Sequence, residues 1–266
     1  MDAGKPIPGV VLAGGKAKPE LMAATGQSNR ALVVVKGKTL LRHVIEALRA
    51  ADAGIGPITV VGDVPEDADY TRLPDGGDFV ANVFAGLTAH AEAPFVLISS
   101  CDLPFLTGES VSAFTREAVA RAEETGAGLI YPVVPVAACL ERFPGVKRTS
   151  LRLREGALTG GNLMLARPGF LLAQQQRIAA AYAARKSPLK LARQLGIGTL
   201  GRLLLSQMVA PGLLTIPFLE ARVSRLLGGP ARALICPYPE IATDLDRPSD
   251  FAAVGLSPYG EGNEVE

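Results

Sequence analysis

Cysteine is scarce in this 266-residue sequence, and its three cysteines, Cys101, Cys139 and Cys236, have no spacing typical of metal ligands. An odd number of widely separated cysteines favours reduced thiols over a disulfide framework. The segment before Gly9 also lacks the apolar core of a secretion signal. Together these absences predict a cytoplasmic protein.

An excess of charge of either sign is also missing. Lysine and arginine together number 27, and aspartate and glutamate together number 26. Nucleic-acid-binding domains usually carry a clear basic surplus, because they neutralise phosphates with lysine and arginine. We therefore expect no nucleic-acid partner.

Long hydrophobic runs are absent as well. Residues 203–219 carry no charge, but a membrane-spanning helix needs about twenty apolar residues. Pro211 and Pro217 would in addition interrupt a helix in this stretch. The sequence thus predicts no integral membrane span and favours a buried helical segment here.

No linker or low-complexity segment divides the chain. Its 29 glycines and 20 prolines are spread through the sequence, and 48% of the residues are hydrophobic, which is enough for one large core. We expect a single domain over residues 1–266, with a helical insertion at about 170–228 and a mobile tail at about 257–266. The insertion is a candidate lid or dimer surface, so a homodimer stays open.

What the sequence does contain is a glycine turn after its first apolar run. Val10–Ala13 is typical of a buried strand, and it ends at Gly14-Gly15. Without Cβ atoms the chain can turn sharply there and bring backbone N–H groups close to a ligand, which is a phosphate-binding geometry. Three cations follow the turn: Lys16, Lys18 and Arg30.

Two common glycine motifs do not account for this turn. The dinucleotide-binding motif needs G-x-G-x-x-G between strand and helix, and Gly14-Gly15-Lys16 does not supply it. The P-loop needs a glycine five residues before the glycine of Gly37-Lys38-Thr39, where Leu32 stands. Lys38 is therefore expected to be a turn residue before the next helix.

Further apolar runs alternate with helical patterns along the chain, which predicts an α/β protein with a doubly wound sheet. The runs expected to be strands are 58–62, 94–100, 128–134 and 231–236. In such sheets ligands bind beyond the carboxyl ends of the strands. A glycine turn at Gly76-Gly77 precedes a helix in which Asn82 and Gly86 share one face, and Gly86 is equally well explained by close contact with a neighbouring element.

Acidic residues stand at two places where strands are expected to end. Asp102 follows the third strand, Pro104 stiffens its turn, and the next helix has its own start signal at Thr107, so Asp102 is free to be a ligand. Asp244 and Asp246 alternate and so point to the same side of an extended segment. Asp250 is expected to start the final helix.

A basic cluster precedes an expected hairpin around Glu155-Gly156. Clustered cations near an exposed glycine pair suit an anionic substrate, whereas an exposed basic edge strand is the structural alternative. The residues concerned are Lys147, Arg148 and Thr149 before the hairpin and Thr159, Gly160, Gly161 and Asn162 on its second arm.

In order along the chain, LAGG, Arg30-Ala-Leu, CDLP and TDLDRPSD resemble the nucleotidyltransferase superfamily, and most of all the molybdenum-cofactor nucleotidyltransferases. The resemblance implies a GT-A-type, three-layer Rossmann-like fold with a mostly parallel sheet and helices on both faces. It implies that Mg²⁺ is held by Asp102 and Asp246, with Lys16, Arg30 and Asp102 as catalytic residues. The implied nucleotide contacts are Leu12, Ala13, Gly14, Gly15, Lys16, Arg30, Gly77 and Asn82, and the implied acceptor contacts are Arg148, Thr149, Gly161 and Asn162.

The implied reaction transfers an NMP from an NTP to a phosphorylated small molecule and releases pyrophosphate. Neither the base nor the acceptor can be read from the sequence. Two alternatives remain. One is a non-catalytic nucleotide-binding relative. The other is a nucleotide-sugar glycosyltransferase, which would need an Asp-x-Asp motif here, but Ser100 stands two residues before Asp102 and Pro104 stands two residues after it. The loop from Gly14 to Asn29 is expected to bury little apolar surface and to be mobile until NTP binds.

Overall fold

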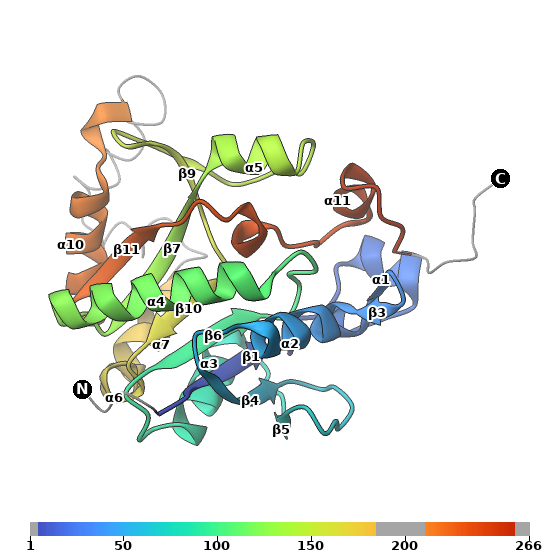
Figure 1. Cartoon of the computed structure of the whole chain (residues 1–266), viewed down its shortest axis with the longest axis horizontal. Coiled ribbons are helices and arrows are strands. Elements are labelled where there is room, and N and C mark those ends of the chain that lie inside the picture. The colour runs from blue at the N-terminus through green and yellow to red at the C-terminus, as the bar shows by residue number, and fades with distance from the viewer. Residues whose placement is uncertain (1–4, 185–210, 259–266) are drawn as a thin grey trace.

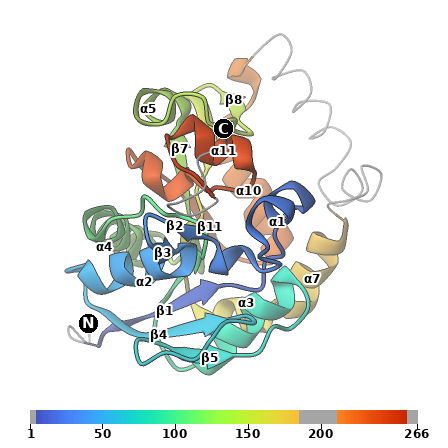
Figure 2. The same cartoon turned by 90° about the vertical axis from the view of Figure 1, so that its right-hand side faces the viewer.

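The computed structural model describes residues 5–184 and 211–258, and in these a nine-stranded sheet is covered by helices on both faces (Figures 1 and 2). The strands are β1 (Ile7–Leu12), β2 (Val34–Val35), β3 (Lys38–Thr39), β4 (Ile55–Val61), β5 (Thr71–Leu73), β6 (Val96–Ser100), β7 (Leu129–Pro135), β8 (Leu151–Leu153), β9 (Gly156–Gly160), β10 (Leu163–Ala166) and β11 (Ala231–Ile235), of which β2 and β3 form a separate hairpin. The α-helices are α1 (Pro19–Thr25), α2 (Leu40–Ala50), α3 (Phe79–Ala89), α4 (Gly108–Thr125), α5 (Val136–Arg142), α6 (Pro168–Ala173), α7 (Gln175–Ala184), α10 (Ile216–Leu227) and α11 (Pro248–Ala253).

The strand order is β5-β4-β1-β6-β10-β7-β9-β8, and β11 also pairs with β7. Neighbours within β5-β4-β1-β6 are parallel, as is the β7–β11 pair, while β10 runs antiparallel between β6 and β7. The predicted α/β architecture with a mostly parallel sheet is therefore confirmed. The predicted hairpin around Glu155-Gly156 is formed by β8 and β9.

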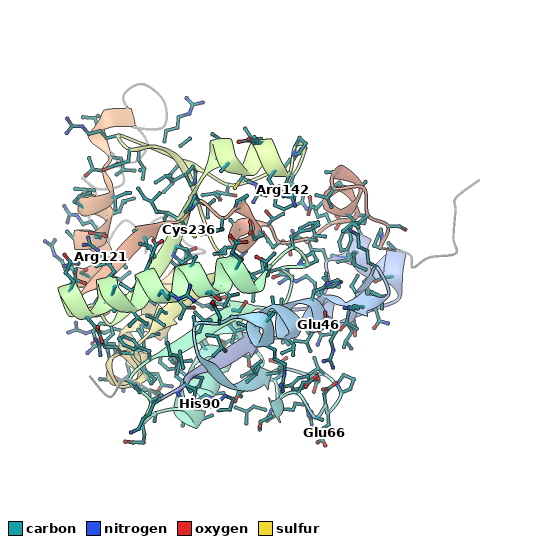
Figure 3. The ribbon with its side chains drawn as sticks, viewed as in Figure 1. Glu46, Glu66, His90, Arg121, Arg142 and Cys236 are labelled. Atoms are coloured by element: carbon teal, nitrogen blue, oxygen red, sulfur yellow. The ribbon has the colours of Figure 1, made fainter. Side chains whose placement is uncertain are left out.

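The central strands are buried on both faces, because helices cover the sheet on both sides. Consecutive side chains point to opposite faces, so each meets a different set of helices. In β1, Val11 packs on the side of helices α2 and α4, and its neighbour Val10 packs on the side of α3 and α6. Both valines are fully buried. Figure 3 shows Glu66 at the lower edge of the molecule, whereas Cys236 is buried within the fold.

Two glycines allow elements to approach β1 and the turn after it. A Cβ on Gly86 would lie 2.4 Å from Val10 Cγ1, so this glycine lets α3 rest directly on β1. The structural explanation of Gly86 is thus confirmed. Gly62, at the end of β4, has a φ of +157°, and a Cβ there would lie 2.4 Å from the carbonyl carbon of Ala13.

Little apolar burial was expected in the loop from Gly14 to Asn29, and this expectation is wrong. Helix α1 forms within it, and Leu21 on this helix is fully buried against Leu245 and Phe251. The base of the loop is closed by a bridge between Lys16 and Asn29. The apolar contact of Leu21 offsets part of the ordering entropy that the composition suggested would go uncompensated.

The predicted helical insertion is described in part. It holds α6, α7 and α10, and α10 begins at a cap formed by the Thr215 hydroxyl, which accepts a hydrogen bond from Phe218 N. Residues 203–210 of the uncharged stretch and most of the predicted mobile tail lie outside the described residues. Among the described helices, none combines the length and apolar character needed to cross a membrane.

Candidate active site

Three carboxylates converge at the carboxyl end of β6. Asp102 follows this strand and is 2% exposed, while Asp244 and Asp246 lie on the extended segment before α11. Their nearest oxygens all lie within 4.8 Å of one another. The backbone N–H of Leu245 donates to the Asp102 carbonyl at 3.3 Å and fastens the two segments together. The expected proximity of Asp102 and Asp246 is found, and its role in metal binding stays a prediction.

Asp244 is the member of this cluster that the sequence prediction left out. The signal was present, because residues two apart on an extended segment face the same side. Asp244 is partly buried, and its pKa is raised by burial and by the negative charge of Asp102, with Arg30 and Arg148 opposing the rise. Burial and like charge thus both disfavour ionised Asp244 when no cation is present.

Two basic side chains pair with Asp102 and Asp246. Arg30 pairs with Asp102 at 3.1 Å (Nη2 to Oδ2) and, through Nη1, with Asp246 Oδ1. Lys18 Nζ donates to Asp246 Oδ2 at 2.7 Å. Burial by itself would lower the pKa of Arg30, but the nearby Asp102 and other acidic groups raise it overall. Arg30, which was expected to face phosphate, here faces the acidic cluster, as does Lys18.

The donor set of this cluster fits a divalent cation. Carboxylate oxygens are the ligands that Mg²⁺ prefers, and two ligands on opposite sides of the ion are about 4.2 Å apart, twice the metal–oxygen distance. Asp102 Oδ1 is buried and has no hydrogen-bond partner within residues 5–184 and 211–258. A buried carboxylate oxygen without a partner is costly, and a bound cation would satisfy it.

The glycine turn lies directly beside this cluster. A Cβ on Gly15 would be 3.1 Å from Arg30 Nη2, the nitrogen that contacts Asp102. Asn29 braces the turn, because its side-chain Nδ2 donates to the Ala13 and Asp63 carbonyls at 2.9 Å each. The structure therefore brings together Gly14, Gly15 and Arg30, as expected, at the ends of β1 and β6. Asn29 was not predicted, although its position just before Arg30 was the available signal.

The remaining predicted nucleotide contacts differ in how far their polar groups are already engaged within the chain. Leu12 and Ala13 lead into the turn, and the Ala13 N–H donates a hydrogen bond to the Val61 carbonyl. Asn82 is 4% exposed, and its amide spans the Asp75–Gly77 turn, accepting from Gly76 N at 2.7 Å and donating to Asp75 Oδ1 at 2.8 Å. The Asn82 side chain thus fixes the Asp75–Gly77 turn beside Gly14.

Lys16 and Gly77 are the exposed members of the predicted set. The Lys16 side chain reaches solvent and makes no ion pair with the described part of the chain. Gly77 has a φ of +86°, a conformation that favours glycine, and open space beside it. Both remain accessible to a nucleotide.

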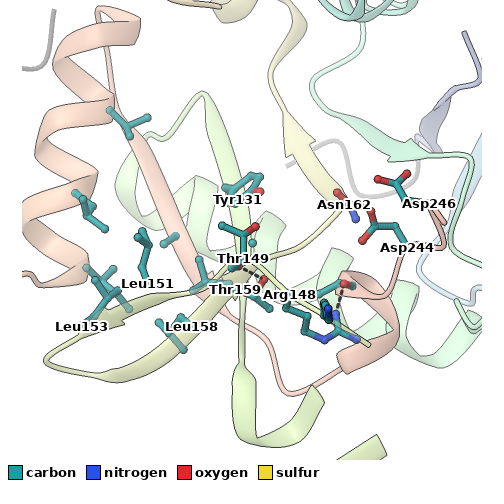
Figure 4. Close-up of a pocket in the computed structure, with 18 of the residues that line it drawn as sticks. Tyr131, Arg148, Thr149, Leu151, Leu153, Leu158, Thr159, Asn162, Asp244 and Asp246 are labelled. Atoms are coloured by element: carbon teal, nitrogen blue, oxygen red, sulfur yellow. Dashed lines mark hydrogen bonds between the residues drawn. The ribbon is translucent and has the colours of Figure 1, made fainter. Parts of the chain in front are cut away.

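A cavity of about 1080 Å³ opens on the other side of the acidic cluster (Figure 4). Its polar end includes three residues of the predicted acceptor set, Arg148, Thr149 and Asn162, next to Asp244 and Asp246. Most of the cavity residues come from β7, the β8–β9 hairpin, α10, β11 and the segment before α11. The carboxylates stand between the glycine turn and this cavity.

The Arg148 fork, which was expected to face an acceptor, is hydrogen-bonded within the chain. Its Nη2 donates to the Thr243 hydroxyl at 2.6 Å and its Nη1 donates to the Ala242 carbonyl. These contacts hold the residues just before Asp244. Arg148 therefore holds the segment that carries Asp244, and both Arg148 and the exposed Lys147 beside it line the cavity.

Gly161 differs from its prediction for a similar reason. Its N–H donates to the Pro132 carbonyl at 3.0 Å, and a Cβ would lie 2.9 Å from both Ile241 Cγ2 and Pro132 Cγ. Asn162 N donates to the Ile241 carbonyl at 2.8 Å. These backbone groups bind the chain where it crosses from β9 to β10. Among the pair, only the Asn162 side chain remains for the cavity.

Residues 9–194 match the family model described as the MobA-like NTP transferase domain. The chain belongs to this family. Membership places it among the nucleotidyltransferases and confirms the superfamily that the four motifs predicted. The matched region includes the glycine turn and Asp102, whereas Asp244 and Asp246 lie beyond it.

Individual relatives agree with this family. A hypothetical transferase from Thermus thermophilus is 38% identical, with a TM-score of 0.80 over 93% of this chain and 99% of that one. The bifunctional enzyme IspD/IspF of Novosphingobium aromaticivorans is 34% identical over 154 residues, covering 53% of this chain and only 37% of that protein. The 2-C-methyl-D-erythritol 4-phosphate cytidylyltransferase of Thermus thermophilus shares the fold, with 18% identity and a TM-score of 0.53 over 94% of this chain and 98% of that one.

Proposed function

We propose that this member of the MobA-like NTP transferase family transfers an NMP from an NTP to a phosphorylated small molecule and releases pyrophosphate, in a Mg²⁺-dependent reaction. The observation that carries the proposal is the place of the three carboxylates, between a glycine turn suited to phosphate and a large cavity. A phosphoryl-transfer site needs the two reactants on opposite sides of one charge-neutralising centre. We place the reaction in the cytoplasm, since all three cysteines are free and buried.

The residues divide the work between the two substrates. The N–H groups of Gly14-Gly15 and the exposed Lys16 suit the triphosphate, and Arg30 supplies a buried positive charge beside Asp102. Asp102, Asp244 and Asp246 would hold Mg²⁺, which when bound supplies further neutralisation of the reacting phosphates. An acceptor phosphate oxygen is already anionic at neutral pH, so no general base is required, and positioning dominates the catalysis.

The identity of the base and of the acceptor is the finer question. The motifs resemble molybdenum-cofactor enzymes, whereas the name of the cytidylyltransferase that shares the fold points to an alditol phosphate and to cytidylyl transfer. A matrix of the four common NTPs against molybdopterin, sugar phosphates and alditol phosphates, read out as pyrophosphate release with and without Mg²⁺, tests the proposal. At least one pair should give turnover.

The matched variants are Asp102→Asn and Asp52→Asn. Asp52 is an exposed partner of Arg116 at the protein surface, so its loss should leave turnover unchanged. Asp102→Asn should remove turnover and leave the fold intact. NTP binding without pyrophosphate release in any pair would favour the non-catalytic alternative. Consumption of a nucleotide sugar, with transfer of the sugar, would favour the glycosyltransferase alternative.

A further inference from the structure

The end of the cavity away from the carboxylates is lined by hydrocarbon. In Figure 4 the labelled leucines lie on one side of Tyr131, and Asn162, Asp244 and Asp246 lie on the other. The apolar lining residues are Leu129 and Val133 of β7, Leu151 and Leu153 of β8, Leu158 of β9, Ile216, Leu219 and Val223 of α10, and Ala231 and Ala233 of β11.

This apolar lining follows from the sequence pattern of the elements around it. Leu129, Tyr131 and Val133 alternate along β7 and so share one face of the sheet, as do Leu151 and Leu153 along β8. On α10 the lining residues recur at helical spacing, three, four and seven positions after Ile216. The strands and the helix around this end of the cavity therefore each contribute apolar side chains to its lining.

Two polar side chains also reach this end, and both are engaged within the chain. Glu220 Oε1 accepts a hydrogen bond from Ala233 N at 2.8 Å. Arg232 Nη1 donates to the Ala231 carbonyl at 3.0 Å. The Glu220 bond ties α10 to β11, and Arg232 Nη1 also lies 3.5 Å from Ser224 Oγ of α10, so part of the hydrogen-bonding capacity of both side chains is already used.

Apolar side chains remain accessible in this cavity. Val223 is 39% exposed and Tyr131 is 38% exposed. Leaving such surfaces in water is unfavourable, and a concave apolar surface of this size is typical of a ligand site. A compact polar acceptor held at the carboxylates would leave this end unfilled.

We propose that the acceptor is an amphipathic phosphate monoester, with its phosphate near the carboxylates and Lys147 and its hydrocarbon chain in the apolar end of the cavity. This inference rests on the proposed function, because it names the class of the second substrate. A new bond forms between an acceptor phosphate oxygen and the α-phosphorus of the NTP. The bond from that phosphorus to the bridging oxygen breaks, and its electron pair leaves with pyrophosphate. The product is a nucleoside diphosphate ester of the hydrocarbon alcohol.

A series of n-alkyl phosphates from butyl to decyl, each below its micelle-forming concentration, tests the inference. Burying one methylene contributes about 0.8 kcal/mol, which is about fourfold in affinity. The dissociation constant, measured by calorimetry without NTP, should therefore fall about fourfold for each added methylene until the cavity is filled. Pyrophosphate release with NTP and Mg²⁺ should show the same trend in KM, and glycerol 3-phosphate should be a poor acceptor.

Val223→Glu and Ala221→Glu form the matched pair of variants. Both place the same charge on α10, but Val223 lines the cavity and the exposed Ala221 does not. Val223→Glu should abolish the dependence on chain length, and Ala221→Glu should retain it. Thermal melting checks that both variants are folded, and Val223→Gln offers an uncharged polar substitution at the same position.

The outcomes separate this inference from the proposed function. Chain-length-dependent binding that Val223→Glu removes, without pyrophosphate release from any NTP, would support the apolar site and refute the transfer reaction. Turnover with polar acceptors, together with equal affinity for butyl and decyl phosphate, would keep the reaction and overturn the apolar acceptor. Equal loss in Val223→Glu and Ala221→Glu would also overturn it, since the effect would not come from the cavity.

Discussion

Ionised Asp244 is unfavourable in the metal-free protein. Its neighbour Asp102 is within 4.8 Å, and burial weakens the screening of their repulsion. Asp244→Asn should therefore raise the melting temperature of the metal-free protein at pH 7, by about 2–4 °C for each kcal/mol of repulsion removed. The same variant should lose most of the stabilisation that Mg²⁺ gives the native chain. Melting curves with EDTA and with Mg²⁺ measure both effects; a lower melting temperature with EDTA would show that Asp244 is stabilising as it stands.

Cys101 permits a prediction about alkaline pH. Burial, and then the charge of Asp102, raise the pKa of this thiol from 9.0 to about 12. An acid with a raised folded pKa loses stability as pH rises through the interval between its unfolded and folded values, because the unfolded chain ionises first. Stability should therefore decline above about pH 9, and Cys101→Ala should make that decline shallower. Urea unfolding between pH 7 and pH 11 measures the slope, and equal slopes would contradict the assignment.

At the scale of elements, α1 depends on a single buried leucine. Leu21 is fully buried against Leu245 and Phe251, and Leu245 lies between the carboxylates Asp244 and Asp246. Leu21→Ala should lower the free energy of unfolding by about 2–5 kcal/mol and should speed proteolysis within residues 14–29. Met22→Ala is the control, because Met22 is 46% exposed. Equal protease sensitivity in the two variants would show that Leu21 does not hold this helix in place.

The turn before β8 contributes two cations with different expected roles. Both side chains line the cavity, and Arg148 in addition binds the residues before Asp244. Arg148→Ala should weaken the stabilisation by Mg²⁺ and lower kcat. Lys147→Ala should leave that stabilisation intact and raise the acceptor KM about tenfold, as expected for a lost charge-assisted hydrogen bond of about 1.5–3 kcal/mol. The reverse pattern would restore Arg148 as the acceptor contact.

The sequence predicted elements well where local pattern and burial agree. β1, β6 and the helix cap at Thr107 follow from apolar runs and capping chemistry, and Asp102 follows from its place after β6. Arg148 could not be assigned in this way, because its hydrogen-bond partners lie 94 and 95 positions away. Leu21 was missed because one leucine among polar residues gives no periodic signal.

The whole molecule should fold without a metal, because its acidic cluster already has internal counterions. Arg30 and Lys18 offset two of the three charges. EDTA treatment should therefore preserve cooperative unfolding, and Mg²⁺ should add stability in proportion to the logarithm of its concentration above the dissociation constant. Calorimetry of treated and Mg²⁺-loaded protein tests this. Loss of the cooperative transition in EDTA would show that the metal is part of the folding core.

The sheet also separates the positions that can change during evolution from those that cannot. β1 and β6, which carry the glycine turn and Asp102, are buried from both faces, so few substitutions there leave a folded protein. The apolar end of the cavity is built at the rim, from β8 at a sheet edge and from α10, which lies beyond the region matched by the family model. Mutations accumulate more freely at such a rim. After gene duplication, one copy of such a chain can shift its choice of acceptor while keeping its nucleotide half, so relatives in other lineages are expected to agree in β1 and β6 and to diverge in α10.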